Sequence, residues 1–158
     1  MDNEIIGILS ALEHELSGIL ELLKDKHEEK LGPHTFISGS IHQTKVVVAM
    51  SYMGKVSAAE TTTLLIHKFN AKKIIFIGVA GALNSNLHIG DIVISKDLYQ
   101  HDVDASPLLP KFELSILGTA AMASDTHLRE EAYAKIKSLI PALKIWKHPI
   151  NCFIADIA

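Results

Sequence analysis

The sequence predicts an α/β fold in which short buried strands alternate with amphipathic helices. Apolar runs suited to buried strands occur at residues 4–9, 45–51 and 74–79. Apolar residues at helical spacing lie between them, at residues 13–24 and 55–69. A strand–helix–strand order of this kind is typical of parallel sheets that are covered by helices.

The bulk composition predicts one globular domain over residues 1–158, with a net charge of −3, 48% hydrophobic and 21% charged residues. A negative net charge argues against a nucleic-acid-binding surface. An apolar run of about 18 residues, the length that spans a membrane, does not occur. The start of the chain lacks a basic leader, and Cys152 is the single cysteine. We therefore expect a cytoplasmic protein without a signal peptide or an internal disulfide.

The first strand is followed by a turn at residues 10–12 and then by the first helix. Ser10 and Glu13 have the spacing of a capping box at the start of this helix. Glu15 lies in the first helical turn, just past the end of the strand. A carboxylate there either complements the helix dipole or faces a ligand crevice at the strand end.

Residues 24–30 are charged and predict an exposed connector. The β-rich runs at 34–41 and 45–51 predict a hairpin. In the following helix, Ser57 and Glu60 again have capping-box spacing.

Residues 74–95, IIFIGVAGALNSNLHIGDIVIS, are the stretch around which the chain is organised. The strand at 74–79 runs into small residues at 78–82, and a second strand is predicted at 92–95. Because bulky side chains are absent from this turn, a ligand can approach its N–H groups closely. A tight turn that only serves packing is the alternative.

The segment after residue 95 contains His101, Asp102 and Asp104. One histidine and two aspartates are too few ligands to predict a metal site. Residues 107–112 form an apolar loop that covers a pocket, forms a subunit contact or simply connects two elements.

Ser124 or Asp125 is expected to cap a third helix, which ends near Pro141. Residues 150–158 predict a last buried strand. An apolar strand as the final element indicates a domain that continues beyond these residues.

Four segments in this order resemble the nucleoside phosphorylase superfamily: IIGILSALEHEL at 5–16, SYMGKVSAAETTTLLI at 51–66, GVAGALNSNLHIGDIVIS at 78–95 and QHDVDAS at 100–106. They are most similar to the 5′-methylthioadenosine/S-adenosylhomocysteine nucleosidases. The resemblance implies a three-layer α/β/α sandwich with a mixed central sheet, incomplete at its C-terminus, and a homodimer. It implies hydrolysis of the N-glycosidic bond of these two adenine nucleosides by water, in methionine salvage, without a cofactor or a metal.

The resemblance also implies roles for individual residues. Glu15 matches the glutamate that activates the attacking water and stabilises the positive charge that develops on the ribose. Leu12 and Met53 match apolar side chains that contact the ribose and the 5′ substituent.

Val79, Ala80 and Gly81 match the turn beneath the nucleoside. Ala105 and Leu108 lie in a loop that lines the 5′-alkylthio pocket of the partner subunit in these enzymes. Val79 departs from the family, which commonly has serine or threonine there. Because valine offers no hydroxyl, the placement of the water or the substrate preference is expected to differ.

The ribose-binding glutamate, the base-stacking aromatic and the aspartate that protonates the purine follow residue 158 in the family pattern. Three explanations are open: a truncated piece of a longer enzyme, one segment of an interrupted reading frame, or a short protein that has lost catalysis. An intact mass well above 17.3 kDa would exclude the third.

Two other functions remain open at this stage. A phosphorylase would use phosphate in place of water, but such enzymes usually present several arginines and this sequence has only Arg129. A non-catalytic nucleoside-binding fragment would bind the nucleoside without releasing the base. A Rossmann domain is disfavoured, because no G-x-G-x-x-G follows the first strand.

Overall fold

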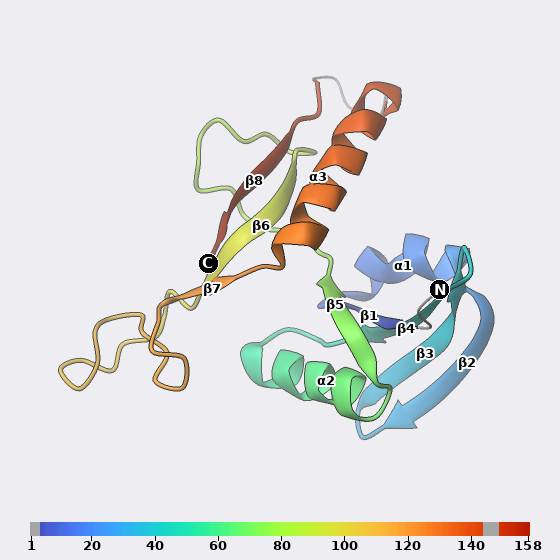
Figure 1. The fold of residues 1–158 in the computed structure, drawn as a ribbon, viewed down its shortest axis with the longest axis horizontal. Helices are drawn as coiled ribbons and strands as arrows, with labels where there is room; N and C mark the ends of the chain where they lie inside the picture. Colours follow the sequence, from blue (N-terminus) through green and yellow to red (C-terminus); the bar gives the residue numbers. More distant parts are fainter. Residues whose placement is uncertain (1–3, 144–148) are drawn as a thin grey trace. The chain divides into compact units, whose positions relative to one another are not determined.

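The computed structural model describes residues 4–143 and 149–158. The chain groups into two compact units, Met1–Gly81 and Ala82–Ala158, called the first and the second unit (Figure 1). The expectation of one domain over residues 1–158 stays a prediction.

The first unit contains a mixed five-stranded sheet with the strand order β2-β3-β4-β1-β5. Strand β1 lies between β4 and β5 and is parallel to both. Strands β2, β3 and β4 form an antiparallel meander. The strand bounds are β1 (Ile5–Ser10), β2 (Lys24–Leu31), β3 (His34–Ile41), β4 (Thr44–Met50) and β5 (Ala71–Phe76).

Helices α1 (Glu13–Leu22) and α2 (Lys55–His67) pack on opposite faces of this sheet. Alternate residues of β4 point to the two faces. Val48 belongs to a buried cluster with Leu16 of α1, and Val47 belongs to another with Leu65 of α2. The first unit is therefore a three-layer α/β/α arrangement.

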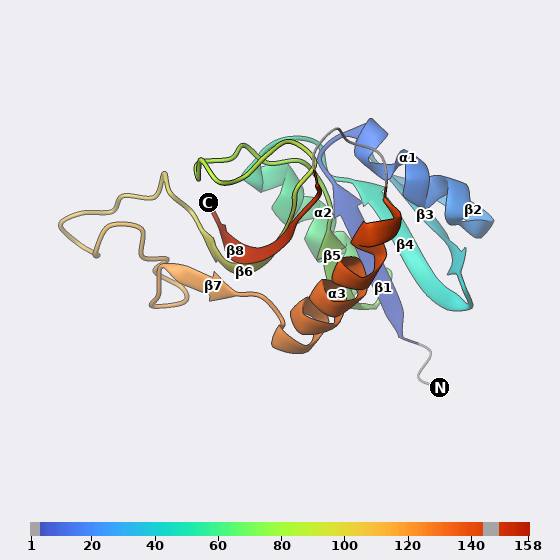
Figure 2. The same ribbon diagram turned by 90° about the horizontal axis from the view of Figure 1, so that it is seen from above.

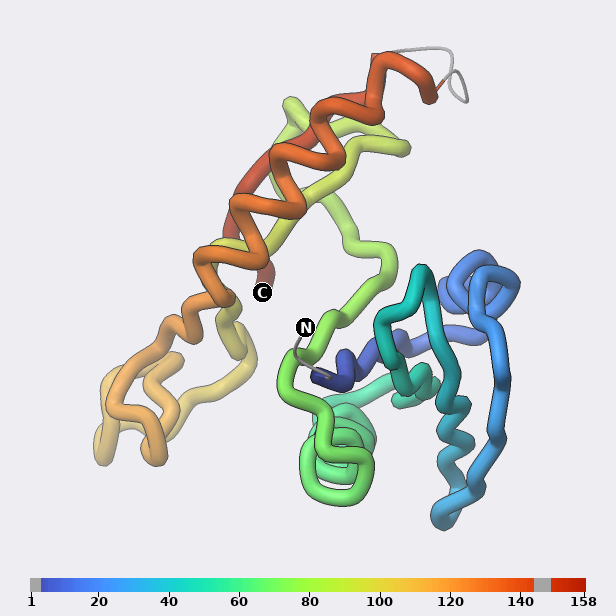
Figure 3. Tube along the Cα trace, turned by 45° about the vertical axis from the view of Figure 1, so that its right-hand side comes forward, coloured from blue at the N-terminus to red at the C-terminus, as the bar shows by residue number. Residues whose placement is uncertain are grey.

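The second unit contains a three-stranded sheet with the order β7-β6-β8. Strand β6 (Ile92–Tyr99) is parallel to β8 (Cys152–Ile157) and antiparallel to β7 (Ala121–Ala123). Figure 3 shows α3 (Thr126–Leu139) running alongside β6 and β8, and η1 (Ile140–Ala142) follows α3 directly. Figure 2 shows that the segment between β6 and β7 extends away from this sheet.

The structure confirms the predicted hairpin and the helices, and it corrects two boundaries. Strand β5 begins at Ala71 and ends at Phe76, earlier than the predicted 74–79, and β6 continues four residues past Ser95 to Tyr99. The predicted connector at 24–30 is wrong, because these residues form most of β2. Their side chains are mostly exposed, so the sequence has no alternation of apolar and polar residues there. Backbone pairing with β3 holds the strand in place.

Both predicted capping boxes are also wrong. Helix α1 begins after Leu12, so Ser10 is too far from it to act as the N-cap, and its hydroxyl donates to Glu15 instead. Helix α2 begins after Gly54, and the Ser57 hydroxyl donates to the carbonyl oxygen of Ser51.

Of the two candidate caps for α3, Asp125 is confirmed. Its carboxylate accepts a hydrogen bond of 2.8 Å from the Leu128 N–H. Within residues 4–143 and 149–158, no helix has the length and apolar character needed to cross a membrane.

Candidate functional site

Glu15 is the centre of the candidate site, and three donors hold its carboxylate. Oε2 accepts hydrogen bonds from the Ser10 hydroxyl and, at 2.9 Å, from the Leu12 N–H. Oε1 accepts a hydrogen bond of 3.0 Å from the Val79 N–H. The side chain is therefore fixed at the carboxyl end of β1 rather than free in solvent.

Parallel pairing of β1 and β5 brings Val79 to Glu15. Leu9 near the end of β1 pairs with Phe76 at the end of β5, and the Ile77 N–H donates to the Leu9 carbonyl at 3.0 Å. The chain that leaves β5 therefore passes the first turn of α1. The predicted turn of small residues thus lies beside the predicted water-activating carboxylate.

Hydrogen bonding lowers the pKa of the Glu15 carboxyl below its usual range. The Ser10 hydroxyl makes the largest contribution; burial opposes it, and the Val79 and Leu12 N–H groups lower the pKa further. Donors to the charged form favour that form. Glu15 is therefore an ionised carboxylate at neutral pH, which is the state that a general base requires.

The other predicted residues of the first unit follow the ends of the parallel strands β1, β4 and β5. Ser51, which follows β4, donates its N–H to the Ser10 carbonyl at 2.8 Å. Met53 lies two residues further along the chain. The Met53 side chain is 78% exposed and that of Val79 is 82% exposed, whereas Leu12 is half-buried. Ala80 and Gly81 are exposed at the end of the same turn.

Ala105 and Leu108 lie in the second unit, within the long segment between β6 and β7. The Ala105 carbonyl accepts hydrogen bonds from the N–H groups of Leu108, at 3.0 Å, and Leu109, at 3.2 Å. Leu108 is 88% exposed, and Ala105 lines a cavity of about 360 Å³ together with Leu109 and Met122. Their expected contact with a partner subunit stays a prediction.

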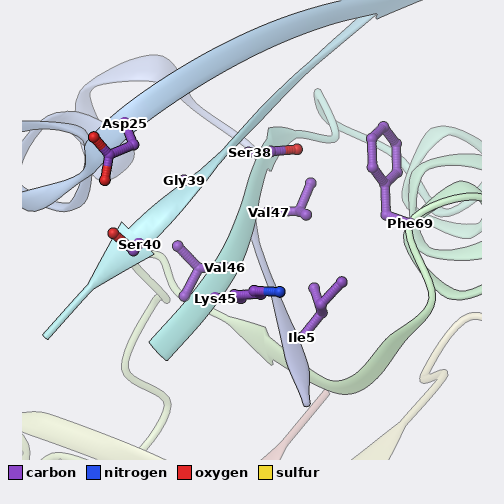
Figure 4. A pocket seen from close by; sticks show the side chains of 9 residues that line it. All are labelled: Ile5, Asp25, Ser38, Gly39, Ser40, Lys45, Val46, Val47 and Phe69. Atoms are coloured by element: carbon purple, nitrogen blue, oxygen red, sulfur yellow. The ribbon is translucent and has the colours of Figure 1, made fainter. Parts of the chain in front are cut away.

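A different cavity, of about 390 Å³, belongs to the first unit. It lies at the end of β1 and β4 that is opposite to Glu15. Figure 4 shows Ile5, Val47 and Phe69 on one side of it and Asp25 and Ser40 on the other. None of the predicted site residues lines this cavity.

The sequence did not show that the Ser10 hydroxyl donates to Glu15 or that Gly78 lies against the Glu15 carboxylate. Ser10 resembled a helix cap, and Gly78 resembled any turn glycine. The one signal for Gly78 was its place in the small-residue turn. In the part of the chain that the structure describes, no group of three or more histidine, cysteine, aspartate or glutamate side chains could hold a metal ion.

The family model described as "Phosphorylase superfamily" matches residues 5–145. The chain belongs to the phosphorylase superfamily. The match covers β1, the Glu15 turn and the small-residue turn at 78–82.

Two curated relatives are each 44% identical to the chain over 102 residues. One is a 5′-methylthioadenosine/S-adenosylhomocysteine nucleosidase of Staphylococcus haemolyticus, for which the match covers 65% of this chain and 45% of the relative. The other is an aminodeoxyfutalosine nucleosidase of Helicobacter pylori, with 64% and 44% covered. The matched residues thus span less than half the length of these relatives.

A solved nucleosidase of Colwellia psychrerythraea in complex with adenine has a TM-score of 0.87 to this structure at 27% identity. The match covers 99% of this chain and 62% of that protein. The prediction of an α/β fold of the nucleoside phosphorylase type is therefore confirmed.

Proposed function

We propose that the complete protein hydrolyses the N-glycosidic bond of 5′-methylthioadenosine and S-adenosylhomocysteine and releases adenine. The observation that carries this proposal is the ionised Glu15 carboxylate, which three donors hold beside the small-residue turn. The 44% identity to a nucleosidase that is named for these two substrates supports the same reaction.

In the proposed reaction, Glu15 takes a proton from a water molecule while the water oxygen forms a bond to C1′ of the ribose. The bond from C1′ to the purine nitrogen breaks, and its electron pair leaves with the base. The purine takes up one proton, which the resemblance assigns to an aspartate after residue 158. The Glu15 carboxylate also stabilises the positive charge that develops on the ribose.

A nucleoside with a different 5′ substituent is a second candidate substrate. The equally similar Helicobacter pylori relative is named for aminodeoxyfutalosine, so that nucleoside belongs in the substrate panel. Leu12, Met53, Val79, Ala80 and Gly81 are proposed to contact the nucleoside. Ala105 and Leu108 are proposed to line the partner's 5′ pocket in a homodimer, and the protein is proposed to act in methionine salvage in the cytoplasm.

The test measures adenine release by the native protein, as its host makes it, from each of the three nucleosides with and without phosphate. We expect release without phosphate. Glu15→Gln should abolish release while nucleoside binding, measured by calorimetry, is retained. Glu13→Gln is the matched control, because Glu13 is exposed in the same helical turn and should leave turnover unchanged.

Unchanged turnover in Glu15→Gln would overturn the proposed role of Glu15. Strict dependence on phosphate would identify a phosphorylase instead. Nucleoside binding without release of the base by the wild-type protein would identify a non-catalytic binding protein.

A further inference from the structure

Ser10 is a fully buried polar residue at the last position of β1, with an exposed fraction of 0%. Its backbone is fixed, because its carbonyl accepts hydrogen bonds from the N–H of Ser51 at 2.8 Å and from the Ser51 hydroxyl at 3.2 Å. The hydroxyl lies near two acceptors, the Leu12 carbonyl at 3.3 Å and, closer, Oε2 of Glu15. The charged and nearer acceptor takes the proton, because charge-assisted hydrogen bonds are shorter and stronger than neutral ones.

Counting lone pairs distinguishes the two oxygens of Glu15. Each carboxylate oxygen has two lone pairs. Oε2 accepts from the Ser10 hydroxyl and the Leu12 N–H, so both of its lone pairs are used. Among the residues that the structure describes, Oε1 accepts one hydrogen bond, from the Val79 N–H. The free accepting position of the carboxylate is therefore on Oε1.

We propose that Ser10 is a positioning residue, whose hydroxyl holds Glu15 through Oε2 and thereby leaves Oε1 to take the proton of the attacking water. This inference rests on the proposed function. The serine also makes Glu15 a weaker base that is ionised over a wider pH range, since its hydrogen bond is the main cause of the lowered pKa of Glu15.

The first test does not need catalysis. The side-chain carboxyl carbon of Glu15 is followed by NMR through a pH titration in the wild-type protein, Ser10→Ala and Ser51→Ala. Ser51 is the matched control, because it is also a buried serine beside β1 and its hydroxyl bonds to backbone carbonyls rather than to Glu15. Ser51→Ala keeps the shorter bond that the Ser51 N–H donates to the Ser10 carbonyl, so the Ser10 backbone stays held. We expect Ser10→Ala to raise the pKa of Glu15 and Ser51→Ala to leave it unchanged.

An unchanged Glu15 pKa in Ser10→Ala, or an equal rise in both variants, would overturn the inference. If Ser10→Ala does not fold, Ser10→Cys takes its place, because a thiol is close in size and a weak donor. These outcomes are independent of turnover, so inactive wild-type protein would contradict the proposed function and leave the Ser10 test intact.

In active protein, Ser10→Ala should lower kcat by about tenfold to a hundredfold, as expected for a misplaced catalytic group. KM should be unchanged, and the acid limb of the kcat/KM profile should move to higher pH. A change in KM alone would contradict the positioning role.

Discussion

A methyl group on Gly78 would lie 3.1 Å from Oε1 of Glu15 and 3.3 Å from Cε1 of Phe76. A side chain at residue 78 would therefore crowd the carboxylate at the position where it accepts from the Val79 N–H. Phe76 ends β5, so the glycine is confined between a strand end and the candidate base.

Gly78→Ala should displace the Glu15 carboxylate by a few tenths of an ångström and lengthen its bond to Val79. We expect kcat for nucleoside hydrolysis to fall by about tenfold or more, because small misplacements of a catalytic group are costly. Nucleoside binding should persist. Steady-state kinetics and calorimetry measure the two effects.

Gly18→Ala is the matched control, because an added methyl there meets no atom within 4 Å on the outer side of α1. It should leave kcat unchanged and raise the free energy of unfolding by about 0.5–1 kcal/mol. If Gly78→Ala turns over like the wild type, the close fit at Gly78 does not matter for the reaction.

Val79→Thr should increase the rate of hydrolysis. The exchange keeps the branched shape and adds a hydroxyl next to the N–H that binds Glu15. One added hydrogen bond to the water is worth about 1 kcal/mol, which corresponds to about fivefold in kcat. Because the side chain is 82% exposed, unfolding free energy should change by less than about 0.5 kcal/mol.

Val79→Ala separates this effect from a change in steric access, because it removes the branched side chain without adding a hydroxyl. A rate increase in both variants would mean that easier steric access, and not the added hydrogen bond, causes the faster hydrolysis. No increase in Val79→Thr would contradict the idea that the missing hydroxyl limits the reaction.

The position of Glu15 could be predicted from the sequence, whereas its supporting contacts could not. A carboxylate one turn after a buried strand and a small-residue turn after another strand both point to the carboxyl edge of a parallel sheet. The Ser10 hydroxyl could equally have capped α1, and only the register of β1, β5 and α1 decides between these roles. That register depends on packing between residues far apart in the chain.

Strands β2 and β7 could not be predicted from the sequence for a related reason. Strand β2 is an edge strand with mostly exposed side chains, and β7 has only three residues, so neither carries a periodic apolar pattern. Both are specified by backbone hydrogen bonds to a neighbouring strand. Pairing of this kind is a property of the fold and leaves little trace in the local sequence.

The Asp91 carboxylate should stabilise the three-stranded sheet where β6 and β8 begin. Its Oδ1 accepts the Asn151 N–H and its Oδ2 accepts the His88 N–H, each at 2.8 Å. The Ile92 N–H in turn donates to the Asn151 carbonyl at 2.9 Å. Asp91→Ala should therefore speed amide hydrogen exchange at Asn151 and Ile92 by about tenfold, as expected for local opening.

Glu131→Ala, an exposed position on α3, serves as the control and should leave these exchange rates unchanged. Unchanged exchange at Asn151 in Asp91→Ala would show that the ends of β6 and β8 are held without this carboxylate.

Glu15 should make the stability of the protein depend on pH in the acid range. Its pKa lies below the ordinary value of 4.5 in the folded protein, mainly because of the Ser10 hydrogen bond. The folded state thus binds the proton less tightly than the unfolded state. The resulting stabilisation is fully present above the unfolded pKa and is lost as the pH falls through the folded pKa.

Glu15→Gln cannot ionise, and its amide group would turn a donor toward one of the three N–H or O–H donors that now face the carboxylate. The variant should therefore be less stable than the wild type at neutral pH. The difference should shrink once the pH falls below 4.5. Urea unfolding at a series of pH values measures both free energies of unfolding, with Glu13→Gln as the control that should follow the wild type. A stability difference between wild type and Glu15→Gln that stays constant from neutral to acid pH would mean that the carboxylate does not gain its stabilisation from these hydrogen bonds.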